Sequence, residues 1–292
     1  MLRRSKRPSV IVLIGFLVLF LATIARAEDH AATQEELQKL SQEASNPVGQ
    51  LWMVANQFNL NVLKSDTIKL FKGQQNQFIW NFQPVMPIGL SESVRVIVRP
   101  VIPFMNSPYI AGPRDLNYTS GIGDIGFQAL LAPNTNALTG FMWGVGPSLI
   151  MPTAANNYLG KGKWQLGPAV AALYLSEKWV VGVYPQQWWS FAGDSSRNNV
   201  SYANIQYFLW YSPAPTWQIG MSPNVTIDWL QEKPEDRLTL PIGLGVSKMF
   251  RLGKLPIKLS FEADYAVIHP RNGPGNEWTF RLNFTPIIKN LF

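Results

Sequence analysis

A two-residue alternation of apolar and polar side chains runs through the chain from about residue 57 to its C-terminal end. Between Leu255 and Tyr265, for example, apolar residues occupy every second position, and most of the residues between them are polar or charged. Because successive side chains of a strand point to opposite faces, this pattern predicts strands with one apolar and one polar face. A mainly helical chain would instead show a period near 3.6.

The alternation divides into twelve segments, most of them ten residues long or longer. The segments are 55–62, 76–89, 93–104, 121–132, 139–151, 164–175, 178–191, 199–212, 216–230, 237–250, 255–268 and 276–289. Strands of soluble domains usually have about five or six residues, whereas a tilted strand that spans a membrane needs about 9–11. The segment lengths therefore indicate membrane-spanning strands.

The connections between the segments alternate between short and long. The shorter ones are 90–92, 133–138, 176–177, 213–215 and 251–254. The longer ones are 63–75, 105–120, 152–163, 192–198, 231–236 and 270–275. Outer-membrane barrels show this alternation, with short periplasmic turns and longer outer loops. The pattern predicts an all-β fold: a transmembrane antiparallel up-and-down β-barrel of about 12 strands, with both termini on the periplasmic side.

The overall hydropathy agrees with a barrel. Hydrophobic residues make up 47% of the chain and charged residues only 15%, yet its mean hydropathy is +0.00. This mean hydropathy is too high for a soluble protein with so few charges and too low for a helical membrane protein. A barrel explains it, since one face of each strand meets lipid and the other meets the lumen. Closure is required because an unpaired backbone amide in hydrocarbon costs several kcal/mol.

Tryptophan placement predicts two belts at the membrane interfaces. Near the long loops lie Trp80, Trp164, Trp188, Trp189, Trp229 and Trp278. Near the short turns lie Trp143, Trp179, Trp210 and Trp217. The indole ring is amphipathic and prefers the headgroup level, so we expect these residues to face the interfaces. A soluble β-sandwich, the alternative, would not need two belts.

Charged residues on the polar faces are the candidates for a lumen or selectivity site. They are Arg95, Arg99, Asp124, Asp228, Lys258, Glu262, Asp264 and Arg281, with Gln128 among the inward polar residues. The last two strands should bring Lys258, Glu262, Asp264 and Arg281 close together. Such a group can be an ion-pair network that satisfies itself or a constriction that selects solutes, as charged rings do in pores. Proline inside predicted strands, as at positions 223 and 241, predicts bulges or bends.

The N-terminal residues carry a targeting signal. Arg3, Arg4, Lys6 and Arg7 precede an apolar run at 10–21, which is followed by the small-residue pattern of Ala25 and Ala27. This predicts a secretory signal peptide over 1–27, cleaved near Ala27, and the alternative is an uncleaved anchor helix. Cleavage leaves 20 Lys and Arg against 18 Asp and Glu. The basic excess thus disappears, and with it the case for a nucleic-acid partner.

The rest of the chain divides into two parts. A helical segment is predicted over 28–54, with a short periplasmic helix at 31–44 that can either plug the lumen or hang in the periplasm. The barrel then extends over 55–292 and ends in Phe292. A C-terminal aromatic residue on the last amphipathic strand resembles the assembly signal of outer-membrane barrels. Localisation in a Gram-negative type of outer membrane follows, with outer-membrane lipid, the barrel-assembly machinery and periplasmic chaperones as partners.

Several short motifs occur in an order that resembles a known family. They lie at 46–49, 121–124, 143–147, 152–154, 159–164, 167–168 and 190–194. Together they resemble the bacterial outer-membrane barrels labelled transporters of the meta-pathway of phenol degradation, over nearly all of residues 46–292. The resemblance implies a β-barrel that passes small solutes, aromatic or hydrophobic ones among them. It carries over no catalytic or binding residue.

The chain offers little for enzyme chemistry. It has two His and no Cys, and His269 has no obvious partner for a catalytic triad. The glycines at 121–126 match a dinucleotide-binding pattern but no helix follows them. We therefore expect no catalytic residue, metal or cofactor. Two functions stay open: a channel or transporter for small solutes, and a non-conducting structural or surface-interaction barrel. The loop predicted at 105–120 could fold into the pore or lie outside it.

Overall fold

The computed structural model describes residues 31–64, 75–112, 115–135, 139–271 and 275–288. The predicted signal peptide with its cleavage site near Ala27, and the predicted assembly signal at Phe292, lie outside these residues. Within the described part of the chain, no helix has the length and apolar character needed to cross a membrane.

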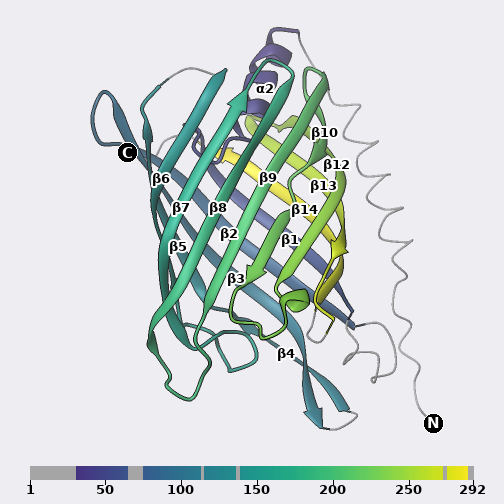
Figure 1. Ribbon diagram of the computed structural model, residues 1–292. Coiled ribbons are helices and arrows are strands. Elements are labelled where there is room, and N and C mark those ends of the chain that lie inside the picture. Colours follow the sequence, from purple (N-terminus) through teal and green to yellow (C-terminus); the bar gives the residue numbers. More distant parts are fainter. Residues whose placement is uncertain (1–30, 65–74, 113–114, 136–138, 272–274, 289–292) are drawn as a thin grey trace, which may run out of the picture.

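Within these residues, one α-helix precedes fourteen strand segments (Figure 1). The elements are α2 (Ala31–Glu43), β1 (Trp52–Lys64), β2 (Gln75–Gly89), β3 (Val94–Gly112), β4 (Asp115–Ile122), β5 (Ile125–Pro133), β6 (Gly140–Met151), β7 (Lys163–Leu175), β8 (Trp179–Gly193), β9 (Ser201–Ala214), β10 (Trp217–Met221), β11 (Asn224–Asp228), the 3₁₀ turn η2 (Pro234–Asp236), β12 (Leu238–Leu252), β13 (Leu255–Ile268) and β14 (Gly275–Ile288).

The strands form a closed antiparallel barrel of 12 strands, which confirms the predicted fold. β1 pairs with β2 on one side and with β14 on the other, so the first and last strands close the wall. β4 and β5 both pair with β3 and act as one interrupted strand. β10 and β11 likewise share β9 and β12 as neighbours. Closure leaves no sheet edge unpaired around the wall.

The strand bounds follow the alternation closely, and the largest difference concerns residues 105–120. The sequence predicts a loop there, whereas β3 continues through Gly112 and pairs with β4 in a long hairpin. Asn106 pairs with Ser120 and Tyr109 with Asn117. Both strands of this hairpin carry polar side chains, which in the sequence are typical of a loop. The first strand also begins earlier than predicted, at Trp52.

The two ends of the barrel differ in their connections. We call the end with the short links 89–94, 133–140, 175–179, 214–217 and 252–255 the turn end, and the opposite end the loop end. The start of β1 lies at the turn end, since Met53 pairs with Val85, close to the short link that follows β2. α2 lies among the strand ends there (Figure 1).

Large apolar side chains cover the outer surface, as a lipid-facing wall requires. Phe141 and Leu244 are 65% and 67% exposed. Of the predicted interface residues, six are markedly exposed: Trp143, Trp164, Trp179, Trp189, Trp229 and Trp278. Trp80 and Trp217 are half-buried on the same outer face, where Trp80 stacks on Phe58 and Phe104 and Trp217 lies against Lys248.

Two of the predicted interface residues lie inside the barrel instead. Trp188 is 6% exposed and its indole N–H donates to Ser148 Oγ at 2.9 Å. Trp210 is also buried and belongs to the interior core. Trp188 and Trp189 are consecutive, so a strand can present only one of them to lipid. Position near a strand end therefore does not decide whether a tryptophan faces the membrane.

Candidate functional site

The lumen at the turn end is filled by a segment that belongs to no strand. This segment, residues 31–51, comprises α2 and the connection to β1, and we call it the plug. Its Leu37 and Val48 are buried, and Leu40, Ala44 and Leu51 pack beside them. The surrounding core consists of inward side chains of the wall: Met53, Val85, Ile97, Leu130, Ala132, Met142, Ala171, Leu173, Val180, Phe208, Trp210, Met249 and Ile287. Of the two predicted alternatives for the helix, the structure therefore has the plug.

Hydrogen bonds tie the plug to several strands around the wall. Arg95 of β3 donates through Nη2 to the Val48 carbonyl at 2.8 Å, and Lys258 of β13 donates to the Ser41 carbonyl at 2.9 Å. Gln42 reaches the Ser176 carbonyl at the β7–β8 turn at 3.0 Å. At the rim, Arg251 pairs with Glu36 at 2.6 Å. These side-chain contacts hold the plug to several strands, and none of them is a strand pairing of the sheet.

Inside the plug, Glu43 fixes the connection to β1. Its Oε1 accepts the Gln50 backbone N–H at 2.9 Å. Burial raises the pKa of the Glu43 carboxyl above its ordinary value, while the Gln50 hydrogen bond opposes that shift. The α2 helix ends ahead of Asn46 and Pro47, and Asn46 Oδ1 accepts the Val48 N–H at 3.0 Å.

One glycine of the wall leaves room for the plug. A β-carbon placed on Gly144 of β6 would lie 2.7 Å from Val48 Cγ1. That separation is closer than real β-carbon contacts, so any side chain at Gly144 would push the plug away from the wall. The absence of a side chain at this position is therefore part of how the plug fits.

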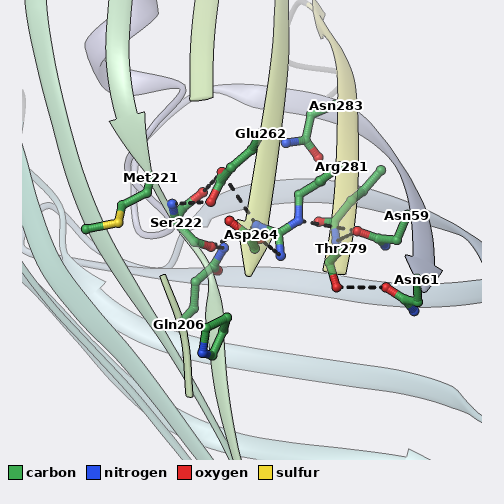
Figure 2. Close-up of polar contacts among 12 residues, drawn as sticks. Asn59, Asn61, Gln206, Met221, Ser222, Glu262, Asp264, Thr279, Arg281 and Asn283 are labelled. Carbon is green, nitrogen blue, oxygen red and sulfur yellow. Dashed lines mark hydrogen bonds and ion pairs between the residues drawn. The ribbon is translucent and has the colours of Figure 1, made fainter. Parts of the chain in front are cut away.

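The middle of the lumen holds a buried ionic cluster on β13 and β14 (Figure 2). Arg281 lies 3.6 Å from Glu262 Oε2 and 3.5 Å from Asp264 Oδ2, and all three side chains are at most 4% exposed. One guanidinium therefore faces two carboxyl groups. Arg281 also donates to Asn59 Oδ1 at 3.3 Å on the neighbouring β1.

The interruption between β10 and β11 completes this cluster. The Ser222 N–H and hydroxyl donate to the two carboxylate oxygens of Glu262 at 2.6 and 2.9 Å. The Ser222 carbonyl in turn accepts from Arg281 Nη1 at 2.8 Å and from Gln206 at 3.1 Å (Figure 2). Pro223 follows Ser222 and supplies no N–H to the ladder, so the predicted bend exposes backbone groups that bind the charges. At Pro241, likewise, the register shifts.

Glycines on β12 make space for the two acids. A β-carbon on Gly243 would collide with the carboxylate of Asp264, and one on Gly245 would press against Glu262. These glycines pair directly with the two acids across the ladder. The carboxyl groups can therefore lie along the wall rather than project across the lumen.

The sequence-predicted charged group only partly comes together. Glu262, Asp264 and Arg281 meet in the cluster, whereas Lys258 lies at the plug, where it contacts Ser41, Ser45 and Gln218. Arg95 also contacts the plug. Arg99 lies between plug and mid-barrel and donates to Gln83 Oε1 at 2.7 Å. The alternation along a strand thus predicts correctly that these residues face the lumen. It does not predict that they lie at different heights along the barrel axis, which keeps them apart.

The two remaining acidic candidates lie at the loop end. Asp124 accepts the backbone N–H groups of Ala154 at 3.2 Å and Lys161 at 2.6 Å, which fixes the loop after β6. Asp228 accepts the Leu230 N–H at 3.2 Å at the end of β11. Both therefore organise loops at the rim. Arg197 joins them there by donating to the Asn157 and Gly160 carbonyls at 3.0 and 2.7 Å.

A second polar network crosses the opposite wall. Tyr184 of β8 donates to Gln128 Oε1 at 2.6 Å, and the Gln128 amide donates to Gln186 at 2.6 Å. All three side chains are buried. The inward position predicted for Gln128 is therefore seen in the structure, although its partners come from β8, several strands away.

Two cavities lie in the barrel, one at the loop end and one beside the plug. One of about 750 Å³ opens among the loops of the loop end and is lined by Arg197, Tyr202 and Asp228, among others. The other, about 130 Å³, lies between the plug and the mid-barrel. We call it the inner cavity. Among the described residues, no group of three or more His, Cys, Asp or Glu side chains is placed to hold a metal ion.

Solved structures with the same fold include outer-membrane proteins. The chain is similar to the COG4313 outer membrane channel from Pseudomonas putida F1, with a TM-score of 0.61, 18% identity, and coverage of 82% of this chain and 94% of that one. At this identity the likeness shows the fold, that of a bacterial outer-membrane β-barrel. The NanC porin and the outer membrane phospholipase A from Escherichia coli match with TM-scores of 0.44 and 0.43, at 10% and 12% identity. They cover 82% and 89% of this chain and 99% of each other chain, and neither likeness is strong enough to bear on function.

Searches of protein-family profiles and of curated proteins find no match.

Proposed function

We propose that the chain is an outer-membrane channel for small solutes that the plug closes at the turn end. The observation that carries this proposal is the way the lumen is blocked. The obstruction is a segment outside the ladder, so its displacement would leave every strand paired with both of its neighbours. A wall that must stay hydrogen-bonded in lipid can tolerate such a movement.

The lumen contents support passage rather than a filled scaffold. A twelve-stranded barrel is wider than the eight-stranded barrels whose own side chains fill the interior. In this chain the interior at the turn end is completed by the plug, and a cavity separates the plug from the polar cluster. The fold shared with the COG4313 outer membrane channel supports the same function.

Small solutes that carry an aromatic or other apolar group fit this lumen best. Phe208 and Trp210 line the inner cavity together with hydrogen-bonding groups. The family resemblance of the sequence agrees with such solutes. The charged candidates on the path are Arg99 and the Arg281 cluster.

A reversible lock on the plug tests the channel. The chain has no Cys, so Val48→Cys with Gly144→Cys introduces the only possible pair. A β-carbon on Gly144 would lie 2.7 Å from Val48 Cγ1, a position that the sulfur introduced by Val48→Cys can take, so the two cysteines are close enough to bond. In planar bilayers, the oxidised protein should stay closed and the reduced protein should show openings. Val48→Cys is the control, because it cannot be locked, whereas Gly144→Cys alone should open in either redox state because its side chain presses on the plug.

A closed lumen under every condition would overturn the proposal. If wild-type and reduced barrels pass neither chloride nor small aromatic solutes in bilayers or liposomes, the barrel is a non-conducting interaction or structural protein. Its function would then lie in the outer loops.

We further propose that the chain reaches the outer membrane after cleavage near Ala27 and that its folding there depends on the barrel-assembly machinery and periplasmic chaperones. The signal-peptide pattern and the C-terminal Phe292 support this route. Deletion of Phe292 should lower the amount of folded barrel in outer-membrane fractions, measured as the heat-modifiable band on gels. An unchanged amount would contradict the assigned role of this residue.

A further inference from the structure

The inner cavity has an unusual balance of charge. Its lining includes two cations, Arg99 and Lys258, and no Asp or Glu among the described residues. Neither cation forms an ion pair with another described residue. Arg99 donates to the neutral amide of Gln83, and Lys258 donates to a carbonyl, a hydroxyl and an amide. A charge away from water is costly unless an opposite charge accompanies it.

Unpartnered donors point to a missing ligand at the same place. Arg99 Nε is buried and has no hydrogen-bond partner among the described residues, and the same holds for the hydroxyl of Ser247. Both residues line the inner cavity. Buried polar groups in folded proteins are nearly always hydrogen-bonded, so two such groups around one cavity indicate that something else completes them.

Part of the lining is apolar. Phe208 and Trp210 of β9 face the inner cavity together with Met53 and Val85. The cavity measures about 130 Å³, and an apolar cavity of about 150 Å³ is known to hold a benzene ring. The volume is therefore of the size of one ring or a short aliphatic chain, and the polar residues of the lining can contact a single charged group on it.

We propose that the inner cavity binds a small organic monoanion with an apolar body, such as an aromatic carboxylate. Its carboxylate accepts hydrogen bonds from Arg99 and Lys258, and its ring lies against Phe208 and Trp210. The proposal deepens the proposed function and rests on it, because the bound anion is the solute that the channel would carry. The nearby Glu262 does not repel the anion strongly, because Ser222 and Arg281 already bind its carboxylate.

The same contact links the solute to the plug. Lys258 holds the plug through the Ser41 carbonyl and the Ser45 hydroxyl. A carboxylate competes for these donors with an advantage, since it adds the attraction between opposite charges to the hydrogen bond that a neutral carbonyl or hydroxyl already offers. Binding of the anion thus weakens the attachment of the plug.

Calorimetric titration of the detergent-purified full barrel with sodium benzoate and with phenol tests the site. Benzoate should bind and phenol should bind far more weakly. Arg99→Gln should weaken benzoate at least about tenfold, the value of a lost charge-assisted hydrogen bond. The control is Arg237→Gln, which makes the same chemical change in an outer loop, where Arg237 Nε donates to the Gln231 carbonyl at 2.9 Å. This control should keep the wild-type affinity.

Lys258→Gln provides a second route if Arg99→Gln fails to fold, and it should weaken benzoate binding as well. Equal affinity for benzoate and phenol, or unchanged benzoate affinity in both cavity variants, overturns the anion site. Conductance recorded on the same preparations separates the two proposals. Benzoate binding without conductance removes the channel and keeps the site, whereas conductance without benzoate binding removes the site and keeps the channel.

Discussion

The turn end and the middle of the lumen both hold buried side chains, but these side chains belong to different parts of the chain. At the turn end, apolar side chains of the wall surround a plug that contributes nothing to the ladder. In the middle, the buried side chains form an ionic cluster along the wall, and its members belong to the strands themselves. The first can leave without damage to the sheet, and the second cannot. Position outside or inside the ladder therefore separates a movable part from a fixed one.

The largest effect should come from the fixed part. Arg281→Ala leaves Glu262 and Asp264 buried without their cation, and removal of one partner from a buried ion pair costs about 3–5 kcal/mol. We expect a marked loss of barrel stability, measured by urea unfolding in lipid vesicles. The triple variant Arg281→Met, Glu262→Gln, Asp264→Asn should recover much of that loss. A single variant as stable as wild type would show that the cluster contributes little to the wall.

The movable part should respond differently to truncation. Leu37→Ala removes a buried contact of the plug, and such changes cost about 2–5 kcal/mol at the site. Because α2 lies outside the ladder, this cost should appear as more frequent channel opening in planar bilayers. Heat-modifiable gel mobility should stay that of wild type. A drop in barrel stability comparable to that of Arg281→Ala would contradict the separation of the two regions.

A smaller effect is expected at the strand interruption. Ser222→Ala keeps the backbone N–H that binds Glu262 and removes only the hydroxyl. The free energy of unfolding should fall by about 1.5–3 kcal/mol, the usual contribution of a hydrogen bond to a charged group. Urea unfolding again measures it. Ser247→Ala is the matched control in the same lumen, because its hydroxyl has no partner among the described residues. Equal losses in the two variants would argue against a specific role for Ser222.

The smallest effect concerns pH. Since burial raises the pKa of Glu43, the seated plug favours the protonated carboxyl. The stabilisation is complete at acid pH and is lost as the pH rises through the raised pKa. We therefore expect open probability to increase with pH just above the ordinary range of a glutamate. Glu43→Gln should abolish this dependence and keep the plug seated, and a slope that persists in this variant would assign the titration to another group.

The alternation in the sequence predicts the barrel well because lipid and lumen impose opposite demands on neighbouring residues. It predicts the plug poorly, since Leu37 and Leu40 form a narrow stripe that suits a helix in several settings. A signal was nevertheless present. The run from Ala169 to Leu175 has no charged or amide side chain on either face, although one face points into the lumen. An apolar inner face requires an apolar partner inside the barrel.

The fixed cluster was only partly predictable for a related reason. Parity along β13 and β14 places Glu262, Asp264 and Arg281 on the inner face, and their cross-strand register brings them together. The contribution of Ser222 depends on the interruption after β10, and a proline marks such a place without indicating which backbone groups turn inward. The 105–120 hairpin escaped prediction because both of its strands carry polar residues.

The covalent link between the plug and the wall has a kinetic consequence. The plug ends at Leu51 and β1 begins at the next residue, so a displaced plug stays tethered at the mouth it has left. A short tether corresponds to a local concentration in the millimolar range. Closure is then an intramolecular step whose rate does not depend on how many barrels the membrane contains. An individual barrel should therefore flicker between two levels of current, and lasting flow should require something that competes continuously with the returning segment.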